Sequence, residues 1–185
     1  MAICIFPGTF NPIHQAHLEM AEFALKNYGF EKIIFIPSYI PPHKEINKNL
    51  AAHRYNMVKL AIAQNKNFEI SDIEYRSEGK SYSLITVQKI IDEYKIQGRL
   101  NFIIGTDAFK NIKSWFHTEE LSRLVHFIIF PREGDIINDA DFSGYSYEIA
   151  NMPLINISST ELRKKHGIGT DKKIEEYIKT NDLYK

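Results

Sequence analysis

The chain of 185 residues has a single cysteine, Cys4, so no disulfide bond can form within it. This scarcity excludes the small extracellular domains that disulfides hold together, and it favours a reducing compartment. Cys4 lies inside the apolar run AICIF, where a thiol usually packs as a small hydrophobic side chain. We therefore expect a cytoplasmic protein that does not use a cysteine nucleophile.

Neither sign of charge dominates, and long hydrophobic runs are missing. Lysine and arginine together number 23, and aspartate and glutamate together also number 23. This balance predicts that neither nucleic acid nor an anionic membrane is a partner. No apolar stretch approaches the roughly 20 residues of a membrane-spanning helix, and no basic region precedes a long apolar one at the N-terminus. Any phosphate group would have to be bound by locally placed donors.

Short apolar runs alternate with helical patterns along the whole chain. The runs that predict buried strands are AICIF (2–6), KIIFIP (32–37), FEISD (68–72), NFIIG (101–105), VHFIIF (125–130) and PLINI (153–157). The helical patterns between and after them cover 14–28, 51–64, 84–95, 158–166 and 171–185. This alternation predicts an α/β fold, with a doubly wound, mostly parallel Rossmann-like sheet and helices on both faces. We expect one domain over 1–185, with a C-terminal helical portion from about 158 packing on it.

The first predicted strand runs into FPGTFNPIH, which suits neither a strand nor a helix. Gly8 allows a ligand to approach the backbone closely, and the amides of Gly8, Thr9 and Phe10 are placed to point at an anion. The helix that begins near His14 adds its positive N-terminal end. His14 and His17 are three residues apart and therefore share one face of its first turn. The stretch predicts a site for phosphate oxygens.

Two other interpretations of this stretch remain open. One is a tight turn followed by two exposed histidines. The other is a metal site, but HxxH supplies only two ligands, and the chain has neither HExxH nor a pair of cysteines to complete a zinc site.

Two further stretches carry donors for a polyanion. In ISSTELR (157–163), the residues at the predicted helix start offer hydroxyls and amides, and Arg163 one turn later offers two parallel donors. In PPHK (41–44), Lys44 is a positive charge in a loop. The alternatives are an ordinary helix cap with a surface arginine, and a solvated loop lysine.

A third group of residues suits a nucleoside. Gly105 ends the NFIIG run and allows a flat ring to lie on the backbone, while Asp107 either accepts from a ribose hydroxyl or, like Thr106, caps the next helix. Trp115 and Phe116 either stack a heterocycle or belong to the core. Ligands of doubly wound sheets bind where the winding reverses. FPGTFNPIH and GTDAF would therefore face one crevice if their strands are neighbours.

With these pieces assembled, the sequence resembles the HxGH nucleotidyltransferase superfamily and, within it, the bacterial nicotinate mononucleotide adenylyltransferases. Ala16 stands where the superfamily usually has a glycine between the two histidines. The matching stretches cover nearly the whole chain in order: GTFNPIHQAH, IPSYIPPHK, AAHRYNMVKLAI, SYS, FIIGTDAF, Trp115 with Phe116, FPREG, ISSTELR and YIKTNDLY.

The resemblance implies adenylyl transfer from ATP to nicotinate mononucleotide, giving nicotinate adenine dinucleotide and pyrophosphate. It implies Mg²⁺ held mainly by the ATP phosphates, with no metal ligand from a side chain. It implies catalytic roles for His14, His17, Lys44 and Arg163. ATP would be bound by Gly8, Thr9, Phe10, Gly105, Asp107, Ser158, Ser159 and Thr160, and the nicotinate nucleotide by Tyr82, Ser83, Trp115, Phe116 and Arg132.

Two competing functions remain at this stage. A pantetheine-phosphate adenylyltransferase would share the fold, and Pro7 resembles the start of that family. His14, the Trp115-Phe116 pair and ISSTELR favour the nicotinate enzyme. A non-catalytic nucleotide-binding module would be expected to have lost one of His14, His17, Lys44 or Arg163, and all are present. The sequence is compatible with a homo-oligomer and does not decide it.

Overall fold

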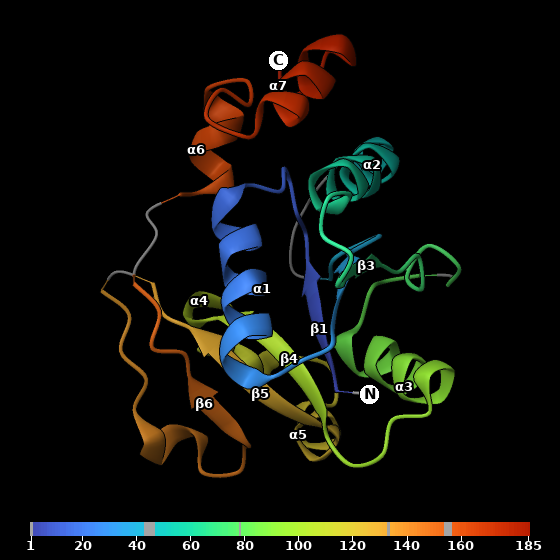
Figure 1. Cartoon of the computed structure of the whole chain (residues 1–185). Coiled ribbons are helices and arrows are strands. Elements are labelled where there is room, and N and C mark those ends of the chain that lie inside the picture. The colour runs from blue at the N-terminus through green and yellow to red at the C-terminus, as the bar shows by residue number, and fades with distance from the viewer. Residues whose placement is uncertain (1, 43–46, 78, 133, 154–156) are drawn as a thin grey trace.

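A parallel β-sheet runs through the centre of the protein (Figure 1). The computed structural model describes residues 2–42, 47–77, 79–132, 134–153 and 157–185. Within them, every pair of neighbouring strands is parallel, in the order β3-β2-β1-β4-β5-β6. The strands are β1 (Ile3–Gly8), β2 (Lys32–Pro37), β3 (Phe68–Ile70), β4 (Leu100–Gly105), β5 (Val125–Phe130) and β6 (Tyr147–Ile149). The predicted doubly wound α/β fold is confirmed, with the winding reversing between β1 and β4.

Helices cover both faces of the sheet. One face carries α1 (Gln15–Tyr28), α2 (Ala51–Ile62) and α7 (Lys172–Thr180). The other carries α3 (Ser83–Tyr94), α4 (Thr106–Phe109) and α5 (Thr118–Leu124). The short 3₁₀ helices are η1 (Lys48–Leu50), η2 (Ile112–Ser114) and η3 (Asp139–Phe142). None of the described helices is both long and apolar enough to cross a membrane.

The central strands β1, β2, β4 and β5 are largely apolar on both sides because each side packs against helices. In β1, Ile3 and Ile5 join the core under α3, whereas Cys4 and Phe6 join the core under α1 and α2. This alternation follows from the two-residue period of a strand. Burial raises the pKa of the Cys4 thiol well above its usual value, so the thiol stays protonated and inert, as the sequence predicts.

The C-terminal helices lie at the end of the molecule where α1 begins. In Figure 1, α6 (Ser159–Lys164) sits beyond the first turn of α1, and α7 lies close to α2. Ile174 and Ile178 of α7 are buried in the same core as Cys4. After its last strand, the chain therefore returns to the side of the sheet where the carboxyl end of β1 lies.

Two predicted details differ from the structure. The sixth described strand is β6 (Tyr147–Ile149), which the sequence did not predict. Of the predicted strand PLINI, Pro153 and Ile157 are in no strand, and residues 154–156 lie outside the described residues. Pro153 has no backbone N–H to donate to a neighbouring strand. In β6 the Tyr147 ring packs against Phe109 at 5.2 Å, while Ile149 is largely exposed. An edge strand of this length carries too little periodicity to be predicted.

The second difference is the helix cap after β4. Gly105 is the N-cap of α4, in place of the predicted Thr106 or Asp107. The hydroxyl of Thr106 is used otherwise: it donates to Asp135 Oδ2 (2.9 Å) and accepts from the Arg132 amide (3.0 Å). Thr106 therefore ties the loop after β5 to the end of β4.

Candidate active site

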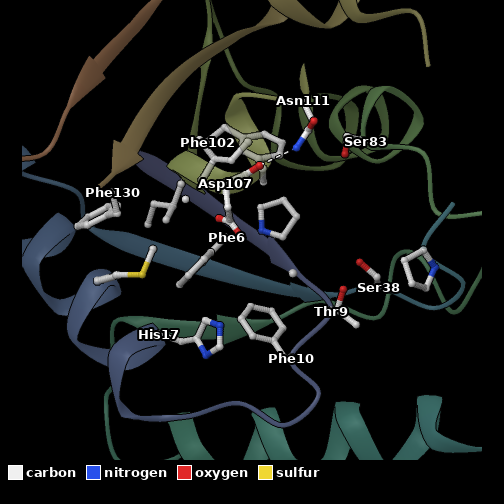
Figure 2. A pocket seen from close by; sticks show the side chains of 18 of the residues that line it. Phe6, Thr9, Phe10, His17, Ser38, Ser83, Phe102, Asp107, Asn111 and Phe130 are labelled. Carbon is white, nitrogen blue, oxygen red and sulfur yellow. Dashed lines mark hydrogen bonds between the residues drawn. The ribbon is translucent and has the colours of Figure 1, made fainter. Parts of the chain in front are cut away.

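A cavity of about 730 Å³ opens at the carboxyl ends of the strands, where the winding reverses (Figure 2). β1 and β4 are neighbours, with Ile5 aligned to Phe102, so Gly8 and Gly105 both line the cavity from their strand ends. This confirms that GTFNPIH and GTDAF face one crevice. Figure 2 shows His17 across the cavity from Asp107.

Most of the predicted site residues line this cavity. They are Gly8, Thr9, Phe10, His14, His17, Tyr82, Ser83, Gly105, Asp107, Trp115, Phe116 and Arg132. Lys44 lies outside the described residues, and nothing is concluded about its place. Ser158, Ser159, Thr160 and Arg163 are not among the described residues that line the cavity.

The turn after β1 is built around the ring of Phe10. Phe10 has a φ of 45°, and its ring is 2% exposed, packing edge-on against His17 at 5.1 Å. A Cβ on Gly8 would lie 2.8 Å from the end of this ring, closer than carbon atoms approach. Gly8 is therefore required to make room for Phe10, in addition to any ligand that approaches it.

His14 and His17 lie together at the start of α1. Their ring centroids are 3.8 Å apart with an angle of 33° between the planes. The His14 amide donates to His17 Nδ1 at 3.2 Å. Because His17 Nδ1 accepts this bond, the proton of the neutral His17 ring is on Nε2. The prediction that both imidazoles share one face of the first turn is confirmed.

The His14 ring is buried without a partner. It is 4% exposed, and neither ring nitrogen has a hydrogen-bond partner among the described residues. Burial, and then the positive charge of Arg132, lower its pKa to about 4. His14 is therefore neutral at pH 7, with one N–H to donate. Since buried polar atoms are normally hydrogen-bonded, an unsatisfied ring on a cavity wall indicates that a ligand completes it.

The start of α6 lies beside the start of α1 but faces the chain itself. Ser159 Oγ donates to the Pro12 carbonyl at 3.1 Å, and Arg163 Nη1 donates to the Asn11 carbonyl at 2.7 Å. Arg163 Nη2 also donates to Thr160 Oγ1 at 3.1 Å. The two helix starts therefore lie side by side. However, the α6 side chains brace the turn that precedes α1 and do not line the cavity.

Aromatic side chains form the opposite end of the cavity. Tyr82 stacks on Phe116 with their centroids 4.5 Å apart and an angle of 30° between the rings. Phe116 lines the cavity and is 41% exposed, so its ring is accessible to a ligand. Trp115 lines the cavity and also packs against the core through Phe102. Its place in the core is confirmed, whereas stacking on a heterocycle stays a prediction.

An ion pair lies beside Gly105, at the end of β4. Arg132 Nε is 3.4 Å from Asp107 Oδ1, and both side chains are about half exposed. A Cβ on Gly105 would lie 2.7 Å from the same Asp107 oxygen. The carboxylate of Asp107 therefore lies over Gly105, in reach of a ligand that rests on that glycine.

One residue behind the cavity was missed from the sequence. Arg54 of α2 is fully buried, and its guanidinium donates to the carbonyls of Thr9 and Ser38, both of which line the cavity. The signal was present in AAHRYNMVKLAI. Arg54 follows Ala51 by three residues and precedes Met57 by three, so it lies on the buried stripe of its helix.

The comparisons with known proteins agree with this site. The model of the cytidylyltransferase-like family matches residues 5–165. The chain belongs to this family. It is 38% identical to a probable nicotinate-nucleotide adenylyltransferase of Caldicellulosiruptor bescii, over 100% of both chains. It is 40% identical to a protein of the same name from Fusobacterium nucleatum, over 89% of this chain and 87% of the other.

Solved structures lead to the same group. Nicotinic acid mononucleotide adenylyltransferase of Plasmodium falciparum, complexed with NaAD, has a TM-score of 0.81 and 25% identity, covering 98% of this chain and 96% of the other. A putative nicotinate-nucleotide adenylyltransferase of Vibrio parahaemolyticus shares the fold with a TM-score of 0.67 at 19% identity, over 98% of this chain and 94% of that one. The resemblance drawn from the sequence is confirmed.

Proposed function

We propose that the protein transfers the adenylyl group of ATP to nicotinate mononucleotide, giving nicotinate adenine dinucleotide and pyrophosphate in NAD biosynthesis. Full-length relatives named nicotinate-nucleotide adenylyltransferases support this reaction. The observation in the structure that carries it is His14, a buried neutral imidazole on the cavity wall with both nitrogens unsatisfied within the described residues. The cytoplasmic location stays a prediction from the sequence.

The chemistry needs no nucleophile from the protein. A 5′-phosphate oxygen of the mononucleotide attacks the α-phosphorus of ATP, the new P–O bond forms, and the bond to the bridging oxygen breaks to release pyrophosphate. Positioning and charge stabilisation can supply most of the catalysis of such a transfer. The protein must hold two phosphates in line and bind the oxygens that gain negative charge.

His14 and His17 are placed to stabilise that charge. The pair lies at the N-terminus of α1, where the helix dipole favours an anion. A neutral imidazole N–H that donates to an oxygen only as charge develops lowers the barrier without binding the ground state too tightly. Lys44 and the remaining donors of Arg163 stay predicted contacts to the departing pyrophosphate.

The end of the cavity that is lined by aromatic side chains suits the mononucleotide. Tyr82, Phe116 and Trp115 offer aromatic faces, and Ser83 offers a hydroxyl close to them. We expect Trp115→Ala to raise KM for nicotinate mononucleotide about tenfold, because an aromatic pair contributes about 0.5–1.5 kcal/mol beyond the area it buries. KM for ATP and kcat should change less than threefold. An unchanged KM for the mononucleotide would show that the indole serves only the core.

Mg²⁺ enters this proposal together with ATP. Asp107 is the only carboxylate residue in the described lining of the cavity, and it pairs with Arg132. No three histidine, cysteine, aspartate or glutamate side chains of the described residues form a group that could hold a metal. Mg²⁺, which prefers oxygen ligands, would be held by ATP phosphates and water. Turnover should stop in EDTA and return with excess MgCl₂, and full turnover in EDTA would contradict this.

Pyrophosphate release tests the proposed reaction. The purified protein is assayed with Mg·ATP and, in separate reactions, nicotinate mononucleotide, nicotinamide mononucleotide and phosphopantetheine. We expect the largest kcat/KM with nicotinate mononucleotide. A preference for phosphopantetheine would replace the proposed acceptor, and no release with any of the three would favour a non-catalytic nucleotide-binding module.

A further inference from the structure

Arg54 of α2 lies directly behind the wall of the cavity. Its side chain is fully buried, and its Nη1 donates to the carbonyls of Thr9 (2.8 Å) and Ser38 (2.5 Å). Its Nη2 donates to the carbonyl of Tyr39 at 3.0 Å. Thr9 belongs to the turn after β1, whereas Ser38 and Tyr39 follow β2. One guanidinium therefore joins the loop after β1, which leads to His14 and His17, to the loop after β2.

The loop after β2 is also hydrogen-bonded to the segment that leads into the aromatic end of the cavity. Ser81 Oγ accepts from the amides of Tyr39 and Ile40, each at 3.0 Å, and the Ser81 amide donates to the Ile40 carbonyl at 2.8 Å. Ser81 precedes Tyr82 and Ser83, which line the predicted nicotinate subsite. Glu74 Oε2 accepts from the Tyr39 amide at 3.2 Å. Hydrogen bonds to backbone atoms thus connect the turn after β1, through the loop after β2, to the segment that carries Tyr82 and Ser83.

An arginine in this place is costly for folding. No carboxylate of the described residues lies within ion-pair distance of Arg54, and its Nε has no hydrogen-bond partner among them. Burial lowers the pKa of Arg54, opposed by Tyr75, Tyr184 and Glu74. Apolar residues of similar volume are often as stabilising as a buried charge. What an apolar residue cannot do is bind carbonyls of two separate loops with one planar, rigid fork.

We propose that Arg54 is a positioning residue that sets the distance between the phosphate side and the nicotinate side of the cavity. The proposal rests on the proposed adenylyl transfer, in which an oxygen bound on one side must meet a phosphorus bound on the other. Each substrate alone contacts mainly its own side. Loosening the connection should therefore spoil the alignment of the two reactants more than the binding of either.

The test compares kcat with the affinity for each substrate alone. Arg54→Lys keeps the positive charge but cannot reach three carbonyls in one plane. We expect kcat to fall about 100-fold, the cost of misplacing reactants by about 1 Å. The Kd of Mg·ATP and the Kd of nicotinate mononucleotide, each measured alone by calorimetry, should change less than threefold.

Two further variants separate positioning from loss of stability. Val58→Ala removes a fully buried side chain from the same helix without touching the loops, and it is expected to lower Tm while kcat stays within twofold of the wild type. Ser81→Ala removes the other anchor of the loop and should lower kcat about tenfold, again with both Kd values kept. If Arg54→Lys does not fold, the kcat and Kd values of Ser81→Ala alone decide whether the connection between the loops positions the substrates.

Near-wild-type kcat in a folded Arg54→Lys, or in Ser81→Ala when the lysine variant does not fold, would overturn the proposal. The proposal would also be overturned if Val58→Ala lost as much kcat as Arg54→Lys when the two variants have equal Tm values. It would be overturned as well if the Kd values of both substrates rose in proportion to the fall in kcat. A wild type without activity would instead refute the proposed function, which is a separate result.

Discussion

Two helices begin at the same edge of the sheet, and they use that position differently. α1 has 14 residues and presents the buried, unpartnered His14 ring to the cavity. α6 has 6 residues and directs Ser159 and Arg163 at the carbonyls of Pro12 and Asn11. In sequence, both looked like anion-binding helix starts. In the structure, the start of α1 faces the cavity, whereas the side chains at the start of α6 face the turn before α1.

The comparison shows how the turn before α1 is held in place before the substrate binds. The Thr9, Asn11 and Pro12 carbonyls are bound by Arg54, Arg163 and Ser159, which come from helices far apart in the sequence. Carbonyls that are occupied by protein donors are fixed in direction, so the turn does not need to reorganise when charge develops. Such preorganisation is where much of the electrostatic contribution to catalysis arises.

The largest effect should come from removing an imidazole of α1. His14→Ala and His17→Ala should each lower kcat about 100- to 1,000-fold, as expected for one oriented transition-state donor. The matched control is His126→Gln, since His126 lies at the start of β5 and bonds to Ser146, away from the cavity. Steady-state kinetics with saturating substrates measure the effect. Turnover near the wild-type value in both α1 variants would remove the histidines from the mechanism.

The burial of His14 should also appear in the pH dependence of stability. The folded-state pKa of about 4 lies below the ordinary histidine value of 6.5, so on acidification the unfolded chain binds a proton that the folded one excludes. His14 therefore contributes no instability above pH 6.5, and stability is lost as pH falls from 6.5 to 4. The total loss in the free energy of unfolding should be about 3 kcal/mol, from about 1.36 kcal/mol for each unit of difference between the two pKa values.

Urea unfolding of the wild type and of His14→Gln at several pH values between 7 and 4.5 isolates this contribution. The two free energies of unfolding should diverge as pH falls, with the wild type losing more. Curves that stay parallel through this range would mean that the His14 ring takes up its proton freely in the folded protein.

Removing the arginine of α6 should cost less than removing an imidazole of α1. Arg163→Ala leaves the Asn11 carbonyl without its donor, and an unsatisfied buried group costs about 1–3 kcal/mol of stability. We expect kcat to fall about tenfold through the loosened turn. A loss of kcat as large as that of His14→Ala would mean that Arg163 binds the phosphates directly, and the contrast between the two helices would disappear.

The smallest effect should come from the C-terminal tyrosine. Tyr184 Oη donates to Asn11 Oδ1 at 2.6 Å, so the last residues of the chain also hold the turn before α1. Tyr184→Phe removes only this bond and should lower the free energy of unfolding by about 1 kcal/mol. Thermal unfolding and kcat measured on one preparation check it. A tenfold loss of kcat without a change in Tm would give Tyr184 a direct part in catalysis.

The regular part of the fold could be predicted because it depends on local pattern. VHFIIF coincides with β5, and Gly29 ends α1 with a φ of 69°, as its place after the periodic stretch predicts. The short edge strand β6 could not, since it gains its order from pairing with Phe127–Ile129.

In the site, too, the features that depend on local spacing could be predicted and those that depend on distant contacts could not. His14 and His17 share a face by spacing alone, whereas the direction of Arg163 depends on where the Asn11–Pro12 turn lies in space. The helical spacing places Arg54 on the buried stripe of α2, but its role could not be predicted because its partners, Thr9, Ser38 and Tyr39, are known only from the structure.

The most direct test of this account is to observe the imidazoles while ATP binds. Protein labelled with ¹⁵N in its histidine rings is titrated with Mg²⁺ and an ATP analogue that has a methylene group between the α- and β-phosphates. The account predicts that the ring nitrogens of His14 and His17 shift at saturation, while those of His53 and His126 do not. Saturation of the site with neither α1 imidazole perturbed would contradict it.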